Sequence, residues 1–279
     1  MTRLQKIASH TLYHRLPGLL IAGTLLIGST INCFGQSEEE RKPDQQSSLV
    51  IKLASGKEEE RLDSLFQLGT LFSQSSTRPT ESTIAALAKT LRDDSSPVIR
   101  ALSARTLDLA NDPRAVPPLL NRLKKEREVA VIKAIIYALA RYPSSEVAYN
   151  LRPYIGHKHQ EVRAAAVYAL AELRDPLATQ PLIDFIRKRI GETDAFARSQ
   201  AVRGLGSIGN RQSIEVLLKA LTRDKSSEVR REAAQALGKI ATRDDQEVID
   251  ALHKATRTSD PYLTMAADEA LALIKNRNE

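Results

Sequence analysis

The chain has 279 residues, of which 42% are hydrophobic but only 4% aromatic, and it contains no Trp. A core of Ala, Leu, Ile and Val suits helix-on-helix packing, and 12 Gly and 12 Pro are too few for a loop-rich fold. The formal net charge of +7 comes from 41 basic and 34 acidic side chains. Such a mixed surface argues against a nucleic-acid binder, and the single cysteine excludes an intrachain disulfide.

Residues 1–35 have the three parts of a secretory signal peptide. Residues 1–15 contain Arg3, Lys6 and Arg15 and no acid, and an apolar run over 16–31 ends in the short boundary 32–35. Gly, Ser and Thr dilute the apolar run, which argues against a permanent transmembrane anchor. We therefore predict that the chain is exported to a periplasmic or envelope-associated location.

Cys33 is the only cysteine, and it lies where the apolar run gives way to a polar tail. Its place resembles that of the lipidated cysteine of a bacterial lipoprotein, with Thr30, Ile31 and Asn32 where the lipobox would be. Asn32 departs from the Gly, Ala or Ser that is usual before such a cysteine. Two routes are open: acylation of Cys33, which gives the chain a lipid anchor, or cleavage after Gly35, which discards the cysteine.

Residues 36–56 are predicted to form a disordered linker. The run over residues 36–48 is rich in Glu, Gln and Ser and has almost nothing to bury. Residues 49–53 are at most a fragment of a first helix. If Cys33 is acylated, such a tether holds the folded part of the chain clear of the membrane.

Residues 57–276 repeat one helical unit with a period of about 30–35 residues, which is the signature of a solenoid. Each unit has an anchor residue, usually Arg, with Leu seven residues later and then a small residue, a rule that Asp108 breaks. The anchors are Arg61, Arg100, Ile132, Arg163, Arg198, Arg230 and Thr264. Because Gly costs about 1 kcal/mol relative to Ala inside a helix, Gly at the small position predicts that another helix backbone passes close by.

The segments between the anchored helices also have helical periodicity. Ile84, Leu87, Ala88 and Leu91 follow the i, i+3, i+4, i+7 pattern of an apolar helix face. No stretch of the array alternates polar and apolar residues with a period of two. The array is therefore predicted to be all-α.

Two stretches of the array resemble HEAT repeats of the short phycobilisome-lyase type. They are Val162–Leu170 and the run from Glu228 to Gly238, which contains Val-Arg and Ala-Leu-Gly. The resemblance covers the whole array. It implies an α-solenoid, a right-handed superhelix of about six to seven helix pairs.

In that family, an acid six residues before the anchor Arg often forms a ladder between neighbouring repeats. Asp94 before Arg100 fits this pattern, as does Asp224 before Arg230. In the middle of the array, His157 stands where the acid is expected. The resemblance therefore implies a ladder that is interrupted there.

Some proteins of this architecture are enzymes, and their required residues can be looked for. Deoxyhypusine hydroxylase holds iron through His-Glu pairs, but this chain has no such dipeptide, and its array holds only His157, His159 and His253. Related DNA glycosylases use aromatic residues in a basic groove, and Trp is absent. Bilin lyase subunits share the repeat type, but export would separate this chain from phycobiliproteins. We predict no catalytic residue, no cofactor, no metal site and no enzyme activity, with His157 and His159 in a solvated turn.

The placement of tyrosines suggests a binding surface. Tyr137 and Tyr168 both lie five residues after an anchor, and Arg105 and Arg203 hold the same position in the flanking units. Stacked repeats would align these four side chains in one stripe, and Tyr and Arg dominate binding hot spots. We predict that the stripe contacts a protein or peptide partner. The alternative is that some tyrosines fill packing gaps, above all Tyr154 beside a proline.

These observations predict an exported, non-catalytic scaffold for protein–protein interaction. Its contact with a membrane would be a lipid anchor at Cys33, and it would bind no nucleic acid. The competing hypothesis is an enzyme or enzyme accessory of the HEAT-like lyase or hydroxylase type. Stoichiometric iron in the purified protein would favour that hypothesis.

Overall fold

The computed structural model describes residues 45–74, 77–190 and 194–277. Within these ranges the chain forms fourteen α-helices, four short 3-10 helices and no strand, which confirms the predicted all-α solenoid. Residues 1–44 lie outside the described ranges. The signal peptide, the first part of the linker and the acylation of Cys33 therefore stay predictions.

Two sets of helices alternate along the chain. The anchor helices, which carry the anchor residues, are α3 (Glu58–Gln74), α5 (Pro97–Ala110), α7 (Val129–Leu139), α9 (Gln160–Leu173), α11 (Ala195–Ile208), α13 (Ser227–Ile240) and α15 (Pro261–Asn276). The intervening helices are α2 (Gln45–Ser55), α4 (Glu81–Asp93), α6 (Val116–Leu123), α8 (Ser145–Leu151), α10 (Thr179–Arg189), α12 (Ile214–Arg223) and α14 (Gln246–Ala255). The 3-10 helices are η1 (Pro113–Ala115), η2 (Arg152–Gly156), η3 (Pro176–Ala178) and η4 (Arg211–Ser213). Each intervening helix packs on the anchor helix that follows it, which gives seven helix pairs in the described ranges.

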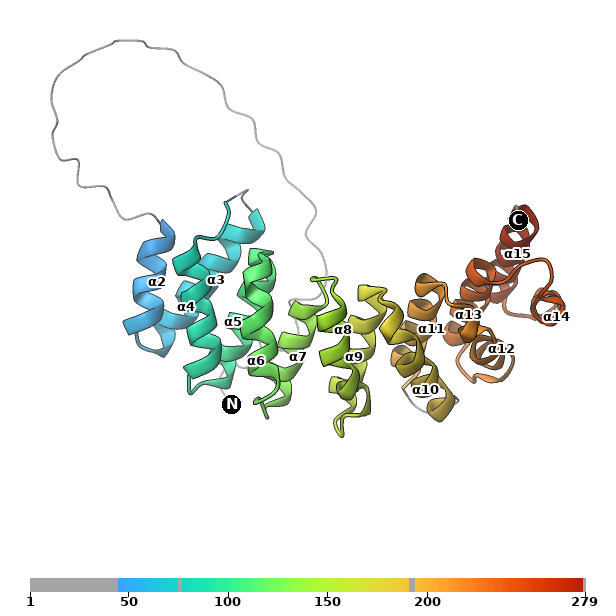
Figure 1. The fold of residues 1–279 in the computed structure, drawn as a ribbon, viewed down its shortest axis with the longest axis horizontal. Coiled ribbons are helices and arrows are strands. Elements are labelled where there is room, and N and C mark those ends of the chain that lie inside the picture. The colour runs from blue at the N-terminus through green and yellow to red at the C-terminus, as the bar shows by residue number, and fades with distance from the viewer. Residues whose placement is uncertain (1–44, 75–76, 191–193, 278–279) are drawn as a thin grey trace, which may run out of the picture. The chain divides into compact units, whose positions relative to one another are not determined.

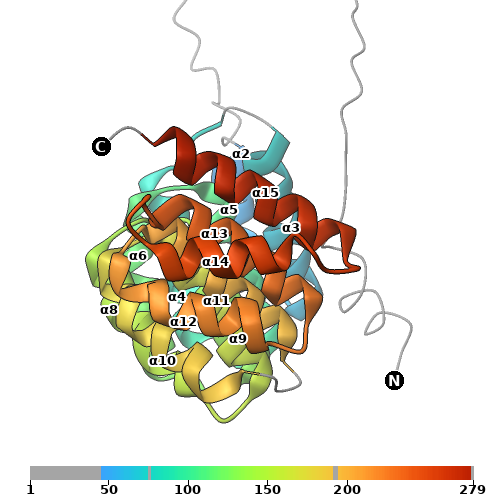
Figure 2. The ribbon, with the colours of Figure 1, turned by 90° about the vertical axis from the view of Figure 1, so that its right-hand side faces the viewer.

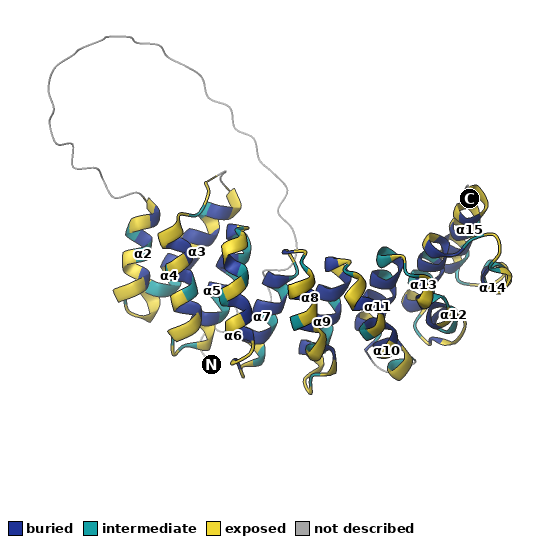
Figure 3. Ribbon diagram, viewed as in Figure 1, coloured by how far each residue is buried: buried dark blue, intermediate teal, exposed yellow. Residues whose placement is uncertain are grey.

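The helix pairs follow one another in a row from α2 to α15 (Figure 1), and Figure 2 views this row from the α15 end. Neighbouring anchor helices pack closely on one another, whereas neighbouring intervening helices are in looser contact. Buried residues lie where helices meet, and exposed residues lie on the outer sides (Figure 3). The anchor helices thus share one outer side, the anchor-helix face, which carries the position five residues after each anchor.

The first helix of the row corrects the predicted linker. Residues 36–56 were expected to be disordered, but α2 covers Gln45–Ser55 and buries Leu49 and Leu53 to 3% and 2% exposure. The buried Gln46 side chain ties α2 to the start of α4. Its amide donates to the carbonyl of Arg78 and accepts from the hydroxyl of Thr83, both at 3.0 Å. One Leu pair and one satisfied amide are enough to dock this polar segment, so Gln45–Ser55 belong to the array.

Close approach of the anchor helices explains the repeated glycines. A Cβ atom on Gly206 of α11, which follows Leu205, would lie 2.8 Å from the Cα of Ala236 on α13. A Cβ on Gly238 of α13 would lie 2.6 Å from the Cα of Ala270 on α15. Real Cβ atoms do not come so near, so only glycine fits at these crossings. The predicted passage of a neighbouring backbone is confirmed at Gly206 and Gly238, whereas at Gly69 the nearest atom is a side-chain carbon of Leu109 at 3.3 Å.

A ladder of ion pairs links successive helix pairs, but its direction differs from the expected one. The carboxylate of Asp94 binds Arg61 of the preceding anchor helix at 2.8 Å, whereas Arg100 donates a hydrogen bond to the backbone carbonyl of Asp94 at 2.9 Å. In the described ranges, which leave out residues 191–193 before α11, the further rungs join an anchor arginine to an acid of the next pair. They are Arg100–Glu126 at 2.9 Å, Arg198–Asp224 at 2.7 Å and Arg230–Asp260 at 4.0 Å.

One rung is missing between α7 and α9. The anchor position of α7 holds Ile132, and the position of the partner acid before α9 holds His157. In the described part of the chain, no ion pair joins α7 to the segment that leads into α9. Both members of the ion pair are thus replaced at this junction, the arginine by Ile132 and the acid by His157. Neither position leaves an unpaired buried charge.

The Arg100–Glu126 ion pair should make the free energy of unfolding depend on pH in the acid range. Burial alone raises the pKa of Glu126, but hydrogen bonds from Arg100, Arg122 and two backbone N–H groups outweigh it and lower the pKa from 4.5 to about 2. A lowered folded-state pKa stabilises the fold above pH 4.5 and loses this effect as the pH falls towards 2. We expect the wild type to lose roughly 3 kcal/mol more than Glu126→Gln over this range, measured by urea unfolding. The exposed Glu161→Gln is the control, and equal acid dependence in Glu126→Gln and wild type would contradict this role.

Candidate functional site

The four residues of the predicted stripe lie on the anchor-helix face. Arg105 belongs to α5, Tyr137 to α7, Tyr168 to α9 and Arg203 to α11, and all four side chains are half-buried. The structure brings the two tyrosines together, with ring centroids 5.6 Å apart and planes at 61°. This edge-to-face pair forms one aromatic surface across two helix pairs.

The guanidinium of Arg203 is already engaged by neighbouring side chains of the array. Its guanidinium donates a hydrogen bond to the side chain of Gln200, one turn earlier on α11, and lies 4.0 Å from the carboxylate of Glu172 on α9. It also faces Glu232 of α13: burial raises the pKa of Glu232, and the charge of Arg203 opposes that rise. These neighbours balance the charge of Arg203, so this end of the stripe carries no excess positive charge.

The other end of the stripe is cationic. Asp108 lies 3.1 Å from Arg141, and burial raises the pKa of Asp108 while the charges of Arg141 and Arg105 oppose the rise. Lys133, half-buried on α7, adds a further positive charge. Two arginines therefore act on the one carboxylate of Asp108, and Lys133 lies two helical turns before Arg141.

The stripe continues to a residue that the sequence argument missed. Phe66 of α3 lies five residues after Arg61, in the same register as Tyr137, and its residue surface is 54% exposed. Val98, at the start of α5, is 56% exposed. The sequence signal for Phe66 is its register, five residues after the anchor Arg61; it is not part of the tyrosine cluster of the middle repeats.

Two other tyrosines of the middle repeats, Tyr142 and Tyr154, have structural roles. Tyr142 is buried and donates its hydroxyl to the carbonyl of Leu107 at 3.1 Å, and burial raises its pKa to about 12. Tyr154 donates to the carbonyl of Leu123 at 2.9 Å, from the 3-10 helix η2 that follows the short α8. The gap-filling role considered for Tyr154 is confirmed.

The histidines near α9 stack beside this packing. The ring of His157 lies 6.3 Å from that of Tyr154 and 5.5 Å from that of His159. Burial, followed by the charges of His159 and Lys158, lowers the pKa of His157. The residues that the structure describes include no cluster of three or more His, Cys, Asp or Glu side chains that could hold a metal ion.

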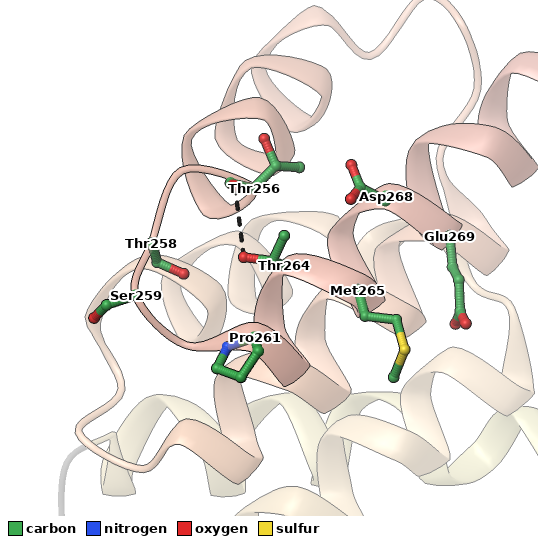
Figure 4. Close-up of a pocket in the computed structure, with 8 residues that line it drawn as sticks. All are labelled: Thr256, Thr258, Ser259, Pro261, Thr264, Met265, Asp268 and Glu269. Atoms are coloured by element: carbon green, nitrogen blue, oxygen red, sulfur yellow. Dashed lines mark hydrogen bonds between the residues drawn. The ribbon is translucent and has the colours of Figure 1, made fainter.

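A shallow hollow of about 620 Å³ lies at the α14–α15 turn (Figure 4). Threonine and serine hydroxyls, Met265, Asp268 and Glu269 line it, and the hydroxyl of Thr264 donates to the carbonyl of Thr256 at 3.5 Å. Thr264 is the anchor of the last pair, where other pairs have Arg. The hollow lies beside α15, and most of its lining comes from that helix and the turn before it.

Across the described ranges, no helix combines the length and the apolar content that a membrane crossing requires.

Comparison with known proteins identifies the family of these repeats. Residues 81–154, 116–193 and 183–272 match the family model for HEAT repeats. The bilin biosynthesis protein PecE of Nostoc sp. is 27% identical over 140 residues, which cover 49% of this chain and 53% of PecE. The phycocyanobilin lyase subunit beta of Thermosynechococcus vestitus is 28% identical over 124 residues, 43% of this chain and 54% of that subunit. The chain thus spans about half the length of these relatives.

A solved structure of an engineered protein shares the fold. It superposes with a TM-score of 0.56 at 22% identity, and the match covers 83% of this chain and 68% of that one. At this identity the likeness concerns the fold alone.

The relatives correct one prediction from the sequence. The scarcity of histidines and the lack of His-Glu pairs predicted that the chain is not an enzyme, and this prediction is wrong. The two relatives carry the names of a lyase subunit and of a bilin biosynthesis protein, which point to lyase-type function. The prediction failed because it searched one chain for catalytic side chains, whereas a subunit can serve an enzyme by binding and positioning alone.

Proposed function

The chain belongs to the HEAT-repeat proteins, and from this premise we propose that it is a subunit of a lyase-type assembly that binds a protein partner on its anchor-helix face. The observation that carries the proposal is the stripe of Phe66, Arg105, Tyr137 and Tyr168, which hold the same register on successive anchor helices and of which the two tyrosine rings are in contact. Exposed aromatic rings and arginines supply the large contact areas and charged hydrogen bonds that dominate protein interfaces. The names of the two relatives support the lyase-type part, with a bilin as the group handled.

In this proposal, the chain contributes binding and orientation to the reaction. A solenoid holds its anchor helices at fixed spacing, so a partner lying along them is held in one register. Fixing a partner in this way removes translational and rotational freedom, which is one of the larger sources of rate enhancement. The chain would position the polypeptide that the lyase reaction modifies.

Site-specific photo-crosslinking tests the binding face. With p-benzoylphenylalanine in place of Tyr137, we expect covalent capture of a partner from a native extract. The same replacement of Tyr149, which is 64% exposed on the intervening helix α8, is the matched control and should capture none. The double substitution of Tyr137 and Tyr168 by Ala should weaken partner binding by about tenfold, because hot-spot truncations cost more than 1 kcal/mol. Equal capture from both positions would reject the face.

A separate measurement tests the lyase-type part. The captured partner, the chain and a free bilin are incubated together, and covalent attachment is read as visible absorbance that survives denaturation. We expect attachment with the wild type and less with the double Tyr variant. Partner capture without any covalent bilin would reject the lyase-type part and keep the binding face.

We also propose that the chain is exported, on the strength of its leader; the polypeptide that it positions is then an exported one and not a phycobiliprotein. If Cys33 is acylated, labelled palmitate should enter the full-length wild type and not Cys33→Ala. Acyl transfer requires the thiol, so the substitution removes the label completely rather than in part. Labelling of both proteins, or of neither, would reject the lipid anchor; recovery of the unprocessed chain in the cytoplasm would reject export.

A further inference from the structure

We propose that the occupant of the anchor-helix face between α3 and α9 is an acidic, proline-rich segment in the polyproline II conformation. This inference deepens the proposed function and rests on it, because it names the chemistry of the partner. It is argued from the spacing of the anchor helices, from the charge of α5 and α7, and from the exposed apolar surface beside them.

The spacing of the anchor helices selects the conformation of the bound segment. Packed helices lie about 8–10 Å apart, and successive anchor helices from α3 to α9 are packed directly on one another. A polyproline II helix repeats every three residues, or about 9 Å, so it presents the same side to each successive anchor helix. A β-strand repeats every two residues, about 7 Å, and an α-helix every 5.4 Å, so neither stays in register.

The positive charge of this face favours a bound segment that carries negative charge. Arg105 and Lys133 make no ion pair in the described part of the chain, and Asp108, which feels the charge of Arg105, is already paired with Arg141. A carboxylate on the bound segment would therefore meet unneutralised cations over α5 and α7. Beyond α9 the balance changes, because Glu172 and Glu232 surround Arg203 there. These acids limit the acidic segment to the region between α3 and α9.

The apolar side chains of this region suit proline rings. Phe66 and Val98 are more than half exposed, and the joined rings of Tyr137 and Tyr168 lie at the next two crossings. Proline-rich segments dock on aromatic surfaces of this kind, and their preformed helix loses little entropy on binding. Each turn of the segment can thus place a proline on an aromatic or apolar group and a carboxylate beside a cation.

Fluorescence anisotropy with labelled peptides tests the inference on the full chain. The probe is a fluorescein-labelled peptide of four Glu-Pro-Pro repeats. Four Lys-Pro-Pro repeats keep the conformation and reverse the charge, and four Glu-Gly-Gly repeats keep the charge and remove the conformation. We expect the probe to bind at least about tenfold tighter than either control, and less tightly as salt rises. Equal binding of either control would overturn the inference.

Charge reversal on the protein locates the site. The double substitution Arg105→Glu with Lys133→Glu should weaken probe binding by about tenfold or more, with an unchanged helical circular dichroism signal. The matched control is Arg231→Glu on α13, which lies outside the proposed region and pairs with Glu228. Equal loss in the control, or no loss in the double variant, would overturn the site. Cross-linking at Tyr137 without probe binding would reject this inference alone, whereas probe binding without any native partner at Tyr137 would reject the proposed function.

Discussion

Replacing Asp224 with Ala is expected to lower the free energy of unfolding by about 3–5 kcal/mol. The Arg198 and Asp224 side chains are 1% and 0% exposed, and the guanidinium donates two hydrogen bonds to the carboxylate, at 2.7 and 2.9 Å. Removing the acid leaves a buried cation without its partner, and the desolvation of that cation is no longer compensated. Urea unfolding followed by circular dichroism measures the loss.

The exposed pair Arg92–Asp93 provides the control for this experiment. These side chains are 66% and 49% exposed, and their contact of 2.8 Å lies in water. Ion pairs of this kind contribute about 0–1 kcal/mol, so Asp93→Ala should change little. If Asp224→Ala were as mild as Asp93→Ala, the ladder would not be a source of stability in this fold.

Replacing Gly204 with Val is expected to destabilise the array by several kcal/mol, although the same change would favour most helices. Leaving Gly for a residue with a Cβ gains up to about 1 kcal/mol of helix propensity. At Gly204 the new Cβ would lie 2.6 Å from the Cβ of Ala171 and 2.8 Å from its Cα, and the Cα belongs to a backbone that cannot rotate away. Overpacking of this kind costs about 1–3 kcal/mol for one added group, and the two extra methyls of Val add to it. Thermal unfolding of the variant measures the balance.

Gly156 is the matched site for this test. A Cβ placed there has no heavy atom within 4 Å. Gly156→Ala should therefore be neutral or slightly stabilising, because Ala restricts the unfolded chain more than Gly does. Equal destabilisation at the two positions would mean that backbone conformation, and not the crossing with α9, requires the glycine.

The fold could be predicted because its information is periodic. Seven anchors with a Leu at fixed distance define the anchor helices, and the helical apolar pattern defines most of the intervening ones. The helix α2 could not be recognised in this way, because it precedes the first anchor and is stabilised by a few contacts of Gln46 and two leucines with α3 and α4. Such contacts join segments far apart in the chain, and no local pattern reports them.

The candidate site was predictable in position but not in character. Repeat register placed Tyr137 and Tyr168 beside each other, as the structure finds. Register alone could not show that Arg203 is engaged by Gln200 and Glu172, because those contacts depend on side-chain directions. For the same reason, the sequence pairs Asp94 with Arg100 of its own unit, whereas the carboxylate reaches back to Arg61.

The missing rung between α7 and α9 has a consequence for cooperativity. In a stacked array, each unit draws its stability from its neighbours, so a weakened junction divides the row into two blocks that unfold less dependently. Tyr137 and Tyr168 lie on opposite sides of this junction and meet on the outer face. A ligand that contacts both rings would hold the two blocks together. Binding on this face would then make the two blocks unfold more cooperatively.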